Sequence, residues 1–580
     1  MNKIDEAGAG EGSDIHRLQH LLSTGDLVHP FLAADYFNGL HKQWDDRHFV
    51  ANFTDLAHAL AFCCGVSRPG KSHDLSAEEA IPVAPPGCFL SAESARKRLV
   101  NDICAGRTGD PVRRHIIFIL CDGMGNDILE RHLQPDSFLL ERNDPNRVRA
   151  VFPSTTPAAL TTFATAEWPG QHGMPGWDLQ DKKGCDFPDA PAQDTVQIRV
   201  LAANISDVRS GRPASEQGFD SWKDIFVVEP WASLAKRNAA SDEQARLHCN
   251  KRRMIYINAY NGDEVPGRYQ GDNDTNPNTD RSSCEELNPR TSPTDFSSWQ
   301  MGAANDQETQ THTSFNWSEA AHISETSYHT LGEPEGSKDA LRYFRDGINS
   351  MLEKIKAADT EDMPTFSYLY FAHPDKHMHA LGVDHPEVGN VVRGIDREIY
   401  RLWEQLGQFL VTDEDSSSDV NLEQKRLDAS VIVTADHGHV TVDPEEMVAL
   451  PQDIIDCLEY ANLGVHGKGR HAYLHCRSGL QSTLKRRWEM ASSVSDKFLL
   501  LTIEEAASFG LWGPIVPNVK VRPRMGDFVA ISTGPHTLVS PKEASKFRHS
   551  CPPLCQGAHG SLLPAEMEIP FILLVPSSEK

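Results

Sequence analysis

The sequence predicts an α/β fold with a mostly parallel central sheet and helices on both faces. Three short runs of β-branched and aromatic residues, HIIFILC at 115–121, TFSYLYFA at 365–372 and SVIVTA at 430–435, each stop abruptly at polar residues. Runs of this length are typical of strands that are buried on both faces of a parallel sheet. Segments with the apolar spacing of helices separate them, and this alternation of strand and helix favours the doubly covered sheet.

Composition excludes some classes of partner. The 580 residues include 56 Lys and Arg against 82 Asp and Glu, a formal net charge of −26. Such a charge argues against a non-specific nucleic-acid surface or an anionic-membrane surface. An anionic substrate would therefore need a local positive charge, such as a metal ion. The N-terminus has no apolar signal-peptide core, and no run of about 18 apolar residues occurs, which favours a soluble cytoplasmic protein.

The cysteines predict no disulfide framework. Twelve are present, at irregular spacing and without the repeated pairs of a zinc ribbon, so reduced thiols are expected. Cys551 and Cys555 stand before His559 at a spacing that imitates a metal cluster, but the two prolines that follow Cys551 favour a loop.

The chain divides into three parts. Residues 1–14 are small and acidic, the composition of a disordered tail. Residues 15–110 are expected to form a helical region that packs on the core, with FTDLAHALAFCCGV at 53–66 and a further helix at 92–104. Residues 111–580 form the α/β domain. Its polar insertions near 260–313 and 411–429 have few aliphatic residues and are expected on the surface.

Along this domain, strands and helices alternate in the expected order. The strand at 115–121 ends at DGMG. A mostly apolar segment at 148–152 is expected to form a second strand that ends just before the serine and threonines of FPSTT. We expect no internal repeat at a fixed period. The remaining expected elements are helices at 337–357, 390–410 and 480–498, and strands at 365–372, 430–435, 471–476 and 569–575.

Thr156 is expected to cap a helix that continues through Pro157 and the residues after it. A hydroxyl at a helix N-terminus lies among unpaired N–H groups and the positive end of the dipole, where phosphate is readily held. Such a position suits a nucleophile that attacks phosphorus. The alternative is an ordinary capping threonine.

Carboxylates and imidazoles follow the predicted strands. Asp122, Asp375, Asp436 and His437 lie at or near carboxyl ends, where α/β sheets bind ligands, and His379 follows Asp375 by one helical turn. These are the usual ligands of zinc or related divalent cations, and their number fits two metals better than one. Two candidates have an ordinary alternative when taken alone. Asp122 would belong to an Asp-Gly turn after the first strand, and His559, near the C-terminus, would lie in a surface loop.

Taken in order, the segments DGMG, FPSTT, PDKHMHALG, TADHG and GAHG resemble the motifs of the alkaline phosphatase superfamily, in its type I phosphodiesterase/nucleotide pyrophosphatase branch, over roughly 115–575. The resemblance implies two divalent metals, usually zinc, and a transiently phosphorylated threonine. It implies hydrolysis of a phosphodiester, pyrophosphate or phosphomonoester bond in a small phosphorylated substrate. One metal would be surrounded by Asp122, Thr156, Asp436 and His437, and the other held by Asp375, His379 and His559.

One position departs from the branch. Its members commonly have an asparagine three residues after the nucleophile, where this chain has Ala159. The substrate phosphate would therefore rely on the metals, on the helix N-terminus and on Asn126, a candidate because it is close to Asp122 in the sequence. The missing asparagine weakens the inference that this chain acts on the same substrates as nucleotide pyrophosphatases.

Other functions and roles stay open. The same metals could serve a phosphonate hydrolase or a phosphoryl transferase, and a non-catalytic protein could keep the fold to bind a phosphorylated partner. The absence of a Cys-x-Pro-Ser-Arg segment argues against a sulfatase. His172, Trp177 and Trp231 either line a pocket or pack in the core. The oligomeric state is not indicated by the sequence.

Overall fold

The computed structural model describes most of the chain outside the insertions. The predicted tail, apart from Asp14, the insertion at 260–313, most of 411–429, and Cys551 and Cys555 lie outside the described residues. The described residues are 14–38, 44–66, 81–85, 87–104, 113–182, 195–201, 204–207, 227–232, 234–235, 252–258, 324–328, 337–408, 410–411, 423–424, 427–459, 465–466, 469–541 and 557–575.

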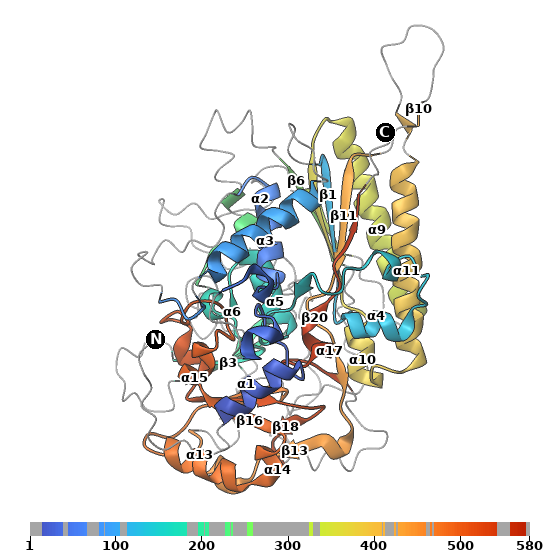
Figure 1. Ribbon diagram of the computed structural model, residues 1–580. Helices are drawn as coiled ribbons and strands as arrows, with labels where there is room; N and C mark the ends of the chain where they lie inside the picture. The colour runs from blue at the N-terminus through green and yellow to red at the C-terminus, as the bar shows by residue number, and fades with distance from the viewer. Residues whose placement is uncertain are drawn as a thin grey trace, which may run out of the picture.

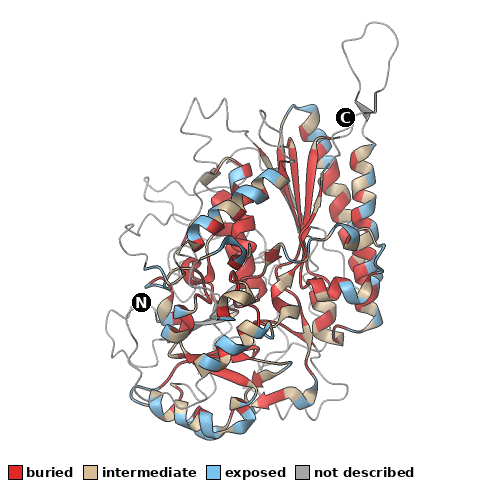
Figure 2. Ribbon diagram, in the orientation of Figure 1, coloured by how far each residue is buried: buried red, intermediate tan, exposed pale blue. Residues whose placement is uncertain are grey.

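A six-stranded sheet forms the centre of the molecule, in the order β21-β11-β1-β8-β6-β7. β1 lies between β8 and β11 and is parallel to both, whereas β21 runs antiparallel to β11 at one edge. All residues of β1, β8 and β11 are buried (Figure 2), as their continuous apolar runs predicted. The mostly parallel α/β sheet is confirmed. Its strands are β1 (His115–Cys121), β6 (Arg253–Asn258), β7 (Ser324–Tyr328), β8 (Thr365–Phe371), β11 (Ala429–Thr434) and β21 (Ile572–Leu574).

Helices cover both faces of this sheet (Figure 1). On one face Phe163 stacks on Phe118 of β1, with ring centroids 4.8 Å apart. On the other face Phe344 stacks on Phe371 of β8, with centroids 4.6 Å apart. The first face carries α2 (Phe53–Cys63), α3 (Cys88–Ile103) and α5 (Thr156–Thr165); the second carries α4 (Asn126–His132), α9 (Ser337–Thr360) and α11 (Pro386–Gly407).

A second, antiparallel sheet follows the parallel one, in the order β14-β15-β17-β16. It packs around an apolar cluster of its own that includes Leu474, Trp488 and Phe498. The helix expected at 480–498 is two shorter helices, and Phe498 already begins β16. The elements of this region are β13 (Met447–Ala449), α12 (Gln452–Ile455), β14 (Val465–His466), β15 (His471–Leu474), α13 (Gln481–Met490), α14 (Ser492–Ser495), β16 (Phe498–Thr502), α15 (Ile503–Ser508), β17 (Phe528–Ser532) and β18 (Thr537–Val539).

Two expected strands differ in the structure. Only Val148–Arg149 of the segment at 148–152 is a strand, β2, and it pairs antiparallel with β20 (Glu568–Ile569) outside the central sheet. The strand expected at 569–575 is divided into β20 and β21, with Pro570 between them. Proline has no N–H to donate to a strand ladder, which explains the interruption.

The N-terminal helices share the core of the central sheet. Leu18 of α1 (Asp14–Thr24), Leu56 of α2 and Ile117 of β1 belong to one continuous apolar cluster. The buried Arg252 guanidinium joins the two regions, since it donates to the carbonyls of Cys63 at 3.1 Å and Arg113 at 2.6 Å. The described cysteines are free thiols. Among the described residues no helix is both long enough and apolar enough to cross a bilayer.

His29 makes the stability of this region sensitive to acid. Its ring is 1% exposed, its Nε2 lies 2.7 Å from the Phe509 carbonyl, and its Nδ1 accepts from the Leu32 N–H at 3.1 Å. Burial lowers the pKa of His29 from 6.5 to about 3. The unfolded chain therefore binds a proton at His29 more readily than the folded protein does. The contribution of the neutral His29 ring to the free energy of unfolding is complete above pH 6.5 and is lost as pH falls from 6.5 towards 3.

We expect His29→Gln to reduce the acid-induced loss of unfolding free energy between pH 6.5 and 4 by about 1–3 kcal/mol. Denaturant unfolding of both proteins across this range measures the difference. His20→Gln, at an exposed position of α1, is the control and should leave the pH slope unchanged. Equal slopes for wild type and His29→Gln would contradict the assignment.

Candidate active site

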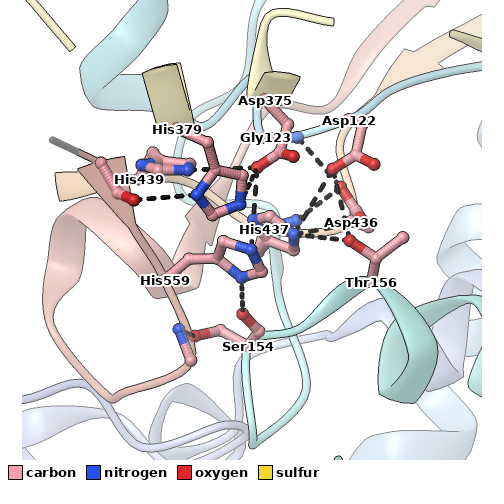
Figure 3. A network of polar contacts seen from close by, with 12 residues as sticks. Asp122, Gly123, Ser154, Thr156, Asp375, His379, Asp436, His437, His439 and His559 are labelled. Carbon is pink, nitrogen blue, oxygen red and sulfur yellow. Dashed lines mark hydrogen bonds and ion pairs between the residues drawn. The ribbon is translucent and has the colours of Figure 1, made fainter. Parts of the chain in front are cut away.

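Three parallel strands deliver acidic residues to one place at their carboxyl ends (Figure 3). Asp122 directly follows β1, and Asp436 is the second residue after β11. Asp375 is the fourth residue after β8 and begins α10 (Asp375–Leu381). The loops are tied together, because the Asp122 N–H donates to the Phe371 carbonyl at 2.9 Å and the Asp375 N–H donates to the Asp122 carbonyl at 3.0 Å. The convergence expected from the sequence is present.

The threonine hydroxyl lies beside these carboxylates. α5 begins at Thr156 itself, and Thr155 occupies the capping position without a side-chain capping bond. The expectation that Thr156 caps the helix is therefore wrong by one residue. Its hydroxyl instead faces the site, 3.1 Å from His437 Nε2 and 3.5 Å from Asp122 Oδ1.

His437 contacts two of the carboxylates. Its Nε2 lies 3.4 Å from Asp122 Oδ1 and 3.4 Å from Asp436 Oδ2. Asp436 Oδ1 accepts from the N–H groups of Gly123 and His437, each at 3.1 Å, so its other oxygen is the one that faces the site. The Tyr370 hydroxyl donates to Asp122 Oδ2 and leaves Oδ1 towards Thr156.

Asp375 is surrounded by three imidazoles. His379 Nε2 lies 3.4 Å from Asp375 Oδ1, which confirms the one-turn spacing expected on a helix. His559 Nε2 lies 3.7 Å from the same oxygen, and His439 Nε2 lies 3.1 Å from it. The sequence prediction missed His439, although the signal was present as a second histidine in Asp-His-Gly-His, two positions after His437.

The histidines share one orientation. The Nδ1 atoms of His379, His437 and His559 lie 2.8, 2.9 and 2.8 Å from the carbonyls of Gly557, Gly438 and Ser154. A carbonyl only accepts, so each Nδ1 carries the proton and each Nε2 presents its lone pair to the carboxylates. Lone pairs and carboxylate oxygens repel at these distances unless a cation lies between them. Backbone acceptors behind the imidazoles are the usual second layer of a metal site.

Buried polar atoms without a hydrogen bond gather at the same point. Within the described part of the chain, Asp375 Oδ1, Asp436 Oδ2 and His439 Nε2 have no hydrogen-bond partner. The 3.1 Å contact between Asp375 and His439 lacks the alignment of a hydrogen bond. Buried polar atoms normally find partners, so three unpaired atoms among these carboxylates and imidazoles fit a site for cations. Carboxylate oxygens and imidazole nitrogens are suitable ligands for it.

Burial opposes charge at the site. Desolvation, followed by repulsion from Asp436, raises the pKa of Asp122 well above its usual range. Burial likewise raises the pKa of Asp436 to about 7 and lowers the pKa of His439 to about 4. Asp122, Asp375 and Asp436 are all buried at this site, and three carboxylates together attract positive charge.

Two overlapping groups could each hold a metal ion. Asp375, His379, His439 and His559 form one, with ligand atoms within 4.8 Å of one another. Asp122, Asp375 and His437 form the other within the same limit, so Asp375 belongs to both. Asp436, expected beside His437, contacts it but is part of neither group.

Asn126 has its amide occupied by the protein. Its Nδ2 donates to the carbonyls of Pro145 at 2.7 Å and Ile569 at 3.3 Å, and its Oδ1 accepts from Asn143 at 2.9 Å. These bonds hold the start of α4 in place. The role of Asn126 in binding phosphate gains no support from these bonds and stays a prediction.

Ala159, His172 and Trp231 pack in the interior, whereas Trp177 is partly exposed. Ala159 is buried within α5. His172 Nε2 lies 3.0 Å from the Thr162 hydroxyl, and the Trp231 indole N–H donates to the Phe163 carbonyl at 2.6 Å. These bonds favour the packing alternative for both residues.

A buried ion pair supports two of the turns that carry histidines. Arg470 Nη2 lies 2.6 Å from Glu566 Oε2, and both side chains are 0% exposed. Glu566 Oε1 accepts from the Ser561 N–H at 3.0 Å, and the Glu566 carbonyl accepts from the Gly438 N–H at 2.8 Å. Gly438 has no room for a side chain, because a Cβ there would lie 1.9 Å from the Ala565 carbonyl oxygen.

A parallel α/β sheet with carboxylates and imidazoles at its strand ends, and a hydroxyl at a helix start beside them, has the features of a metal-dependent hydrolase. The family model of type I phosphodiesterase / nucleotide pyrophosphatase matches residues 116–561. The chain belongs to this family, as the order of its motifs predicted, and is a hydrolase that acts on phosphoric ester bonds.

Solved structures of similar proteins include murine ectonucleotide pyrophosphatase / phosphodiesterase 5, at 15% identity and a TM-score of 0.46, covering 80% of this chain and 88% of that one. Phosphonoacetate hydrolase from Sinorhizobium meliloti 1021, in complex with phosphonoacetate, is similar at 16% identity and a TM-score of 0.45, covering 82% and 93%. No curated protein matches the chain.

Proposed function

We propose that the protein hydrolyses a phosphodiester, pyrophosphate or phosphomonoester bond of a small phosphorylated substrate, with Thr156 as nucleophile and two divalent cations. The observation that carries this proposal is the contact of the Thr156 hydroxyl with His437 and Asp122, at the start of α5. A nucleophile, a group of metal ligands and a helix N-terminus that favours anions thus meet at one point.

The ligand sets keep the assignment that the order of the sequence motifs implies, and the side-chain groups around Asp375 and around His437 support them. Asp375, His379 and His559 would hold one cation, and Asp122, Asp436 and His437 would hold the other beside Thr156. The number of imidazoles favours zinc over magnesium or calcium, which prefer oxygen ligands. Bound cations would supply the positive charge that lowers the pKa of the hydroxyl and stabilises charge on the phosphate oxygens.

The proposed reaction has two covalent steps, and Thr156 takes part in both. The Thr156 oxygen forms a bond to phosphorus and loses its proton, while the bond from phosphorus to the leaving oxygen breaks and that oxygen takes up a proton. Water then attacks the phosphothreonine, which releases phosphate or a phosphate monoester and restores the hydroxyl. The start of α5 binds the phosphoryl oxygens through its N–H groups during both steps.

A substrate panel with metal add-back tests the proposal. We expect release of nitrophenol from a nitrophenyl phosphodiester or monoester, a fall of at least about 100-fold after removal of metal by a chelator, and recovery with zinc. Parallel assays with a nitrophenyl phosphonate and with an alcohol acceptor separate hydrolysis of esters from the phosphonate and transfer alternatives. A metal-free protein that is silent across the panel would support a non-catalytic binding protein instead.

A further inference from the structure

His439 is placed at the metal ligands by strand pairing. It lies between His437 and β12 (Val440–Thr441), and its side chain is 0% exposed. β12 pairs antiparallel with β19 (Gly557–Ala558), with Val440 opposite Ala558. This register puts His439 opposite His559, and their ring centroids lie 5.2 Å apart. Figure 3 shows the two rings on the same side of Asp375 as His379.

The contact of His439 with Asp375 is the shortest that an imidazole makes to Asp375 Oδ1 in this group. The distance from Nε2 to Oδ1 is 3.1 Å, against 3.4 Å for His379 and 3.7 Å for His559. His439 Nδ1 faces the Val440 carbonyl at 3.4 Å, the same orientation as in the other histidines. The buried Nε2 thus points its lone pair at the carboxylate.

The backbone around His439 leaves space for its ring. A Cβ at Gly557 would lie 2.6 Å from His439 Cε1 and 2.3 Å from the Met378 carbonyl oxygen. Only glycine fits between the ring and α10, so the chain approaches the histidine closely without displacing it. The same glycine carbonyl lies 2.8 Å from His379 Nδ1, which fixes the neighbouring ring.

On the basis of the two-cation site proposed above, we propose that His439 is a direct ligand of the cation held by Asp375, His379 and His559. That cation then has four protein ligands. Zinc with four protein ligands is a closed site, whereas a catalytic zinc has three protein ligands and one open position. The cation beside His439 is therefore expected to be retained more tightly than the cation beside Thr156.

X-ray absorption at the zinc edge tests this on the wild-type protein. Dialysis against a mild chelator should leave one zinc per chain, and its spectrum should fit three imidazoles and one carboxylate in four coordination. Two imidazoles with a bound water at the retained zinc would overturn the assignment. Loss of both ions at the same chelator concentration would overturn it as well.

Variants of His439 test it independently. His439→Ala and His439→Asn should weaken binding of the retained zinc by at least 10- to 100-fold in competition with a chromophoric chelator. The matched control is His377→Asn, on the same helix as His379, where the ring contacts His373 at 2.7 Å rather than the ligands. It should bind zinc like the wild type. Unchanged affinity in a folded His439 variant would refute the inference.

The outcomes separate this inference from the proposed function. If the wild type binds two zinc ions and hydrolyses phosphoesters while folded His439 variants retain full affinity, only the role of His439 fails. If the wild type binds no metal, or Thr156 proves dispensable, the proposed function fails as well. Circular dichroism and the denaturation midpoint of each variant show whether a loss of zinc reflects unfolding.

Discussion

Replacement of Thr156 by alanine is expected to lower kcat/KM for phosphoester hydrolysis by on the order of 10³-fold or more. The substitution removes the only atom that we propose to bond to phosphorus, and it leaves the ligand side chains in place. Thr156 is 4% exposed, and the loss of its side chain affects a helix that is buried throughout. Zinc content should stay close to that of the wild type.

The neighbouring threonine offers a matched control. Thr155→Val removes a buried hydroxyl that has no hydrogen-bond partner among the described residues, at nearly constant shape. It should retain activity within a few-fold of the wild type. Thr156→Ser keeps a hydroxyl and should regain part of the lost rate. Full activity in Thr156→Ala, with the metal content unchanged, would rule out the nucleophile.

Replacement of Arg470 by alanine is expected to lower the free energy of unfolding by about 3–5 kcal/mol. The substitution leaves the Glu566 carboxylate buried without its ionic partner, and Glu566 also accepts from Ser561 near His559. The carbonyl of Glu566 also accepts from the N–H of Gly438, which lies between His437 and His439. Displacement of Glu566 should therefore weaken zinc retention too. Denaturant unfolding of the zinc-loaded protein measures the change.

An exposed ion pair provides the comparison. Arg522 contacts Glu504, whose side chain is 70% exposed, so Arg522→Ala should cost no more than about 1 kcal/mol. The double variant Arg470→Met/Glu566→Leu removes both buried charges and should recover part of the stability. If Arg470→Ala and Arg522→Ala cost the same, the buried pair has no special role.

Much of the fold could be predicted from the sequence because its signals are local. The strands at His115–Cys121 and Thr365–Phe371 and the helix that begins at Ser337 follow from apolar runs and periodicity. The predictions that were wrong concern segments whose structure depends on a pairing partner far away in the sequence. The apolar segment at 148–152 reads as a core strand, yet it reaches its partner β20 outside the central sheet.

The sequence by itself determined the order and chemical type of the site residues. A strand that stops at a polar residue puts that residue at the carboxyl end, so Asp122, Asp375 and Asp436 could be assigned to one edge without any knowledge of contacts. Tertiary structure decided the rest. Pairing of β12 with β19 brings His439 to Asp375, and the amide of Asn126 donates to the carbonyl of Ile569, which lies 443 residues away in the chain. Both depend on contacts between residues far apart in the chain, for which local spacing carries no signal.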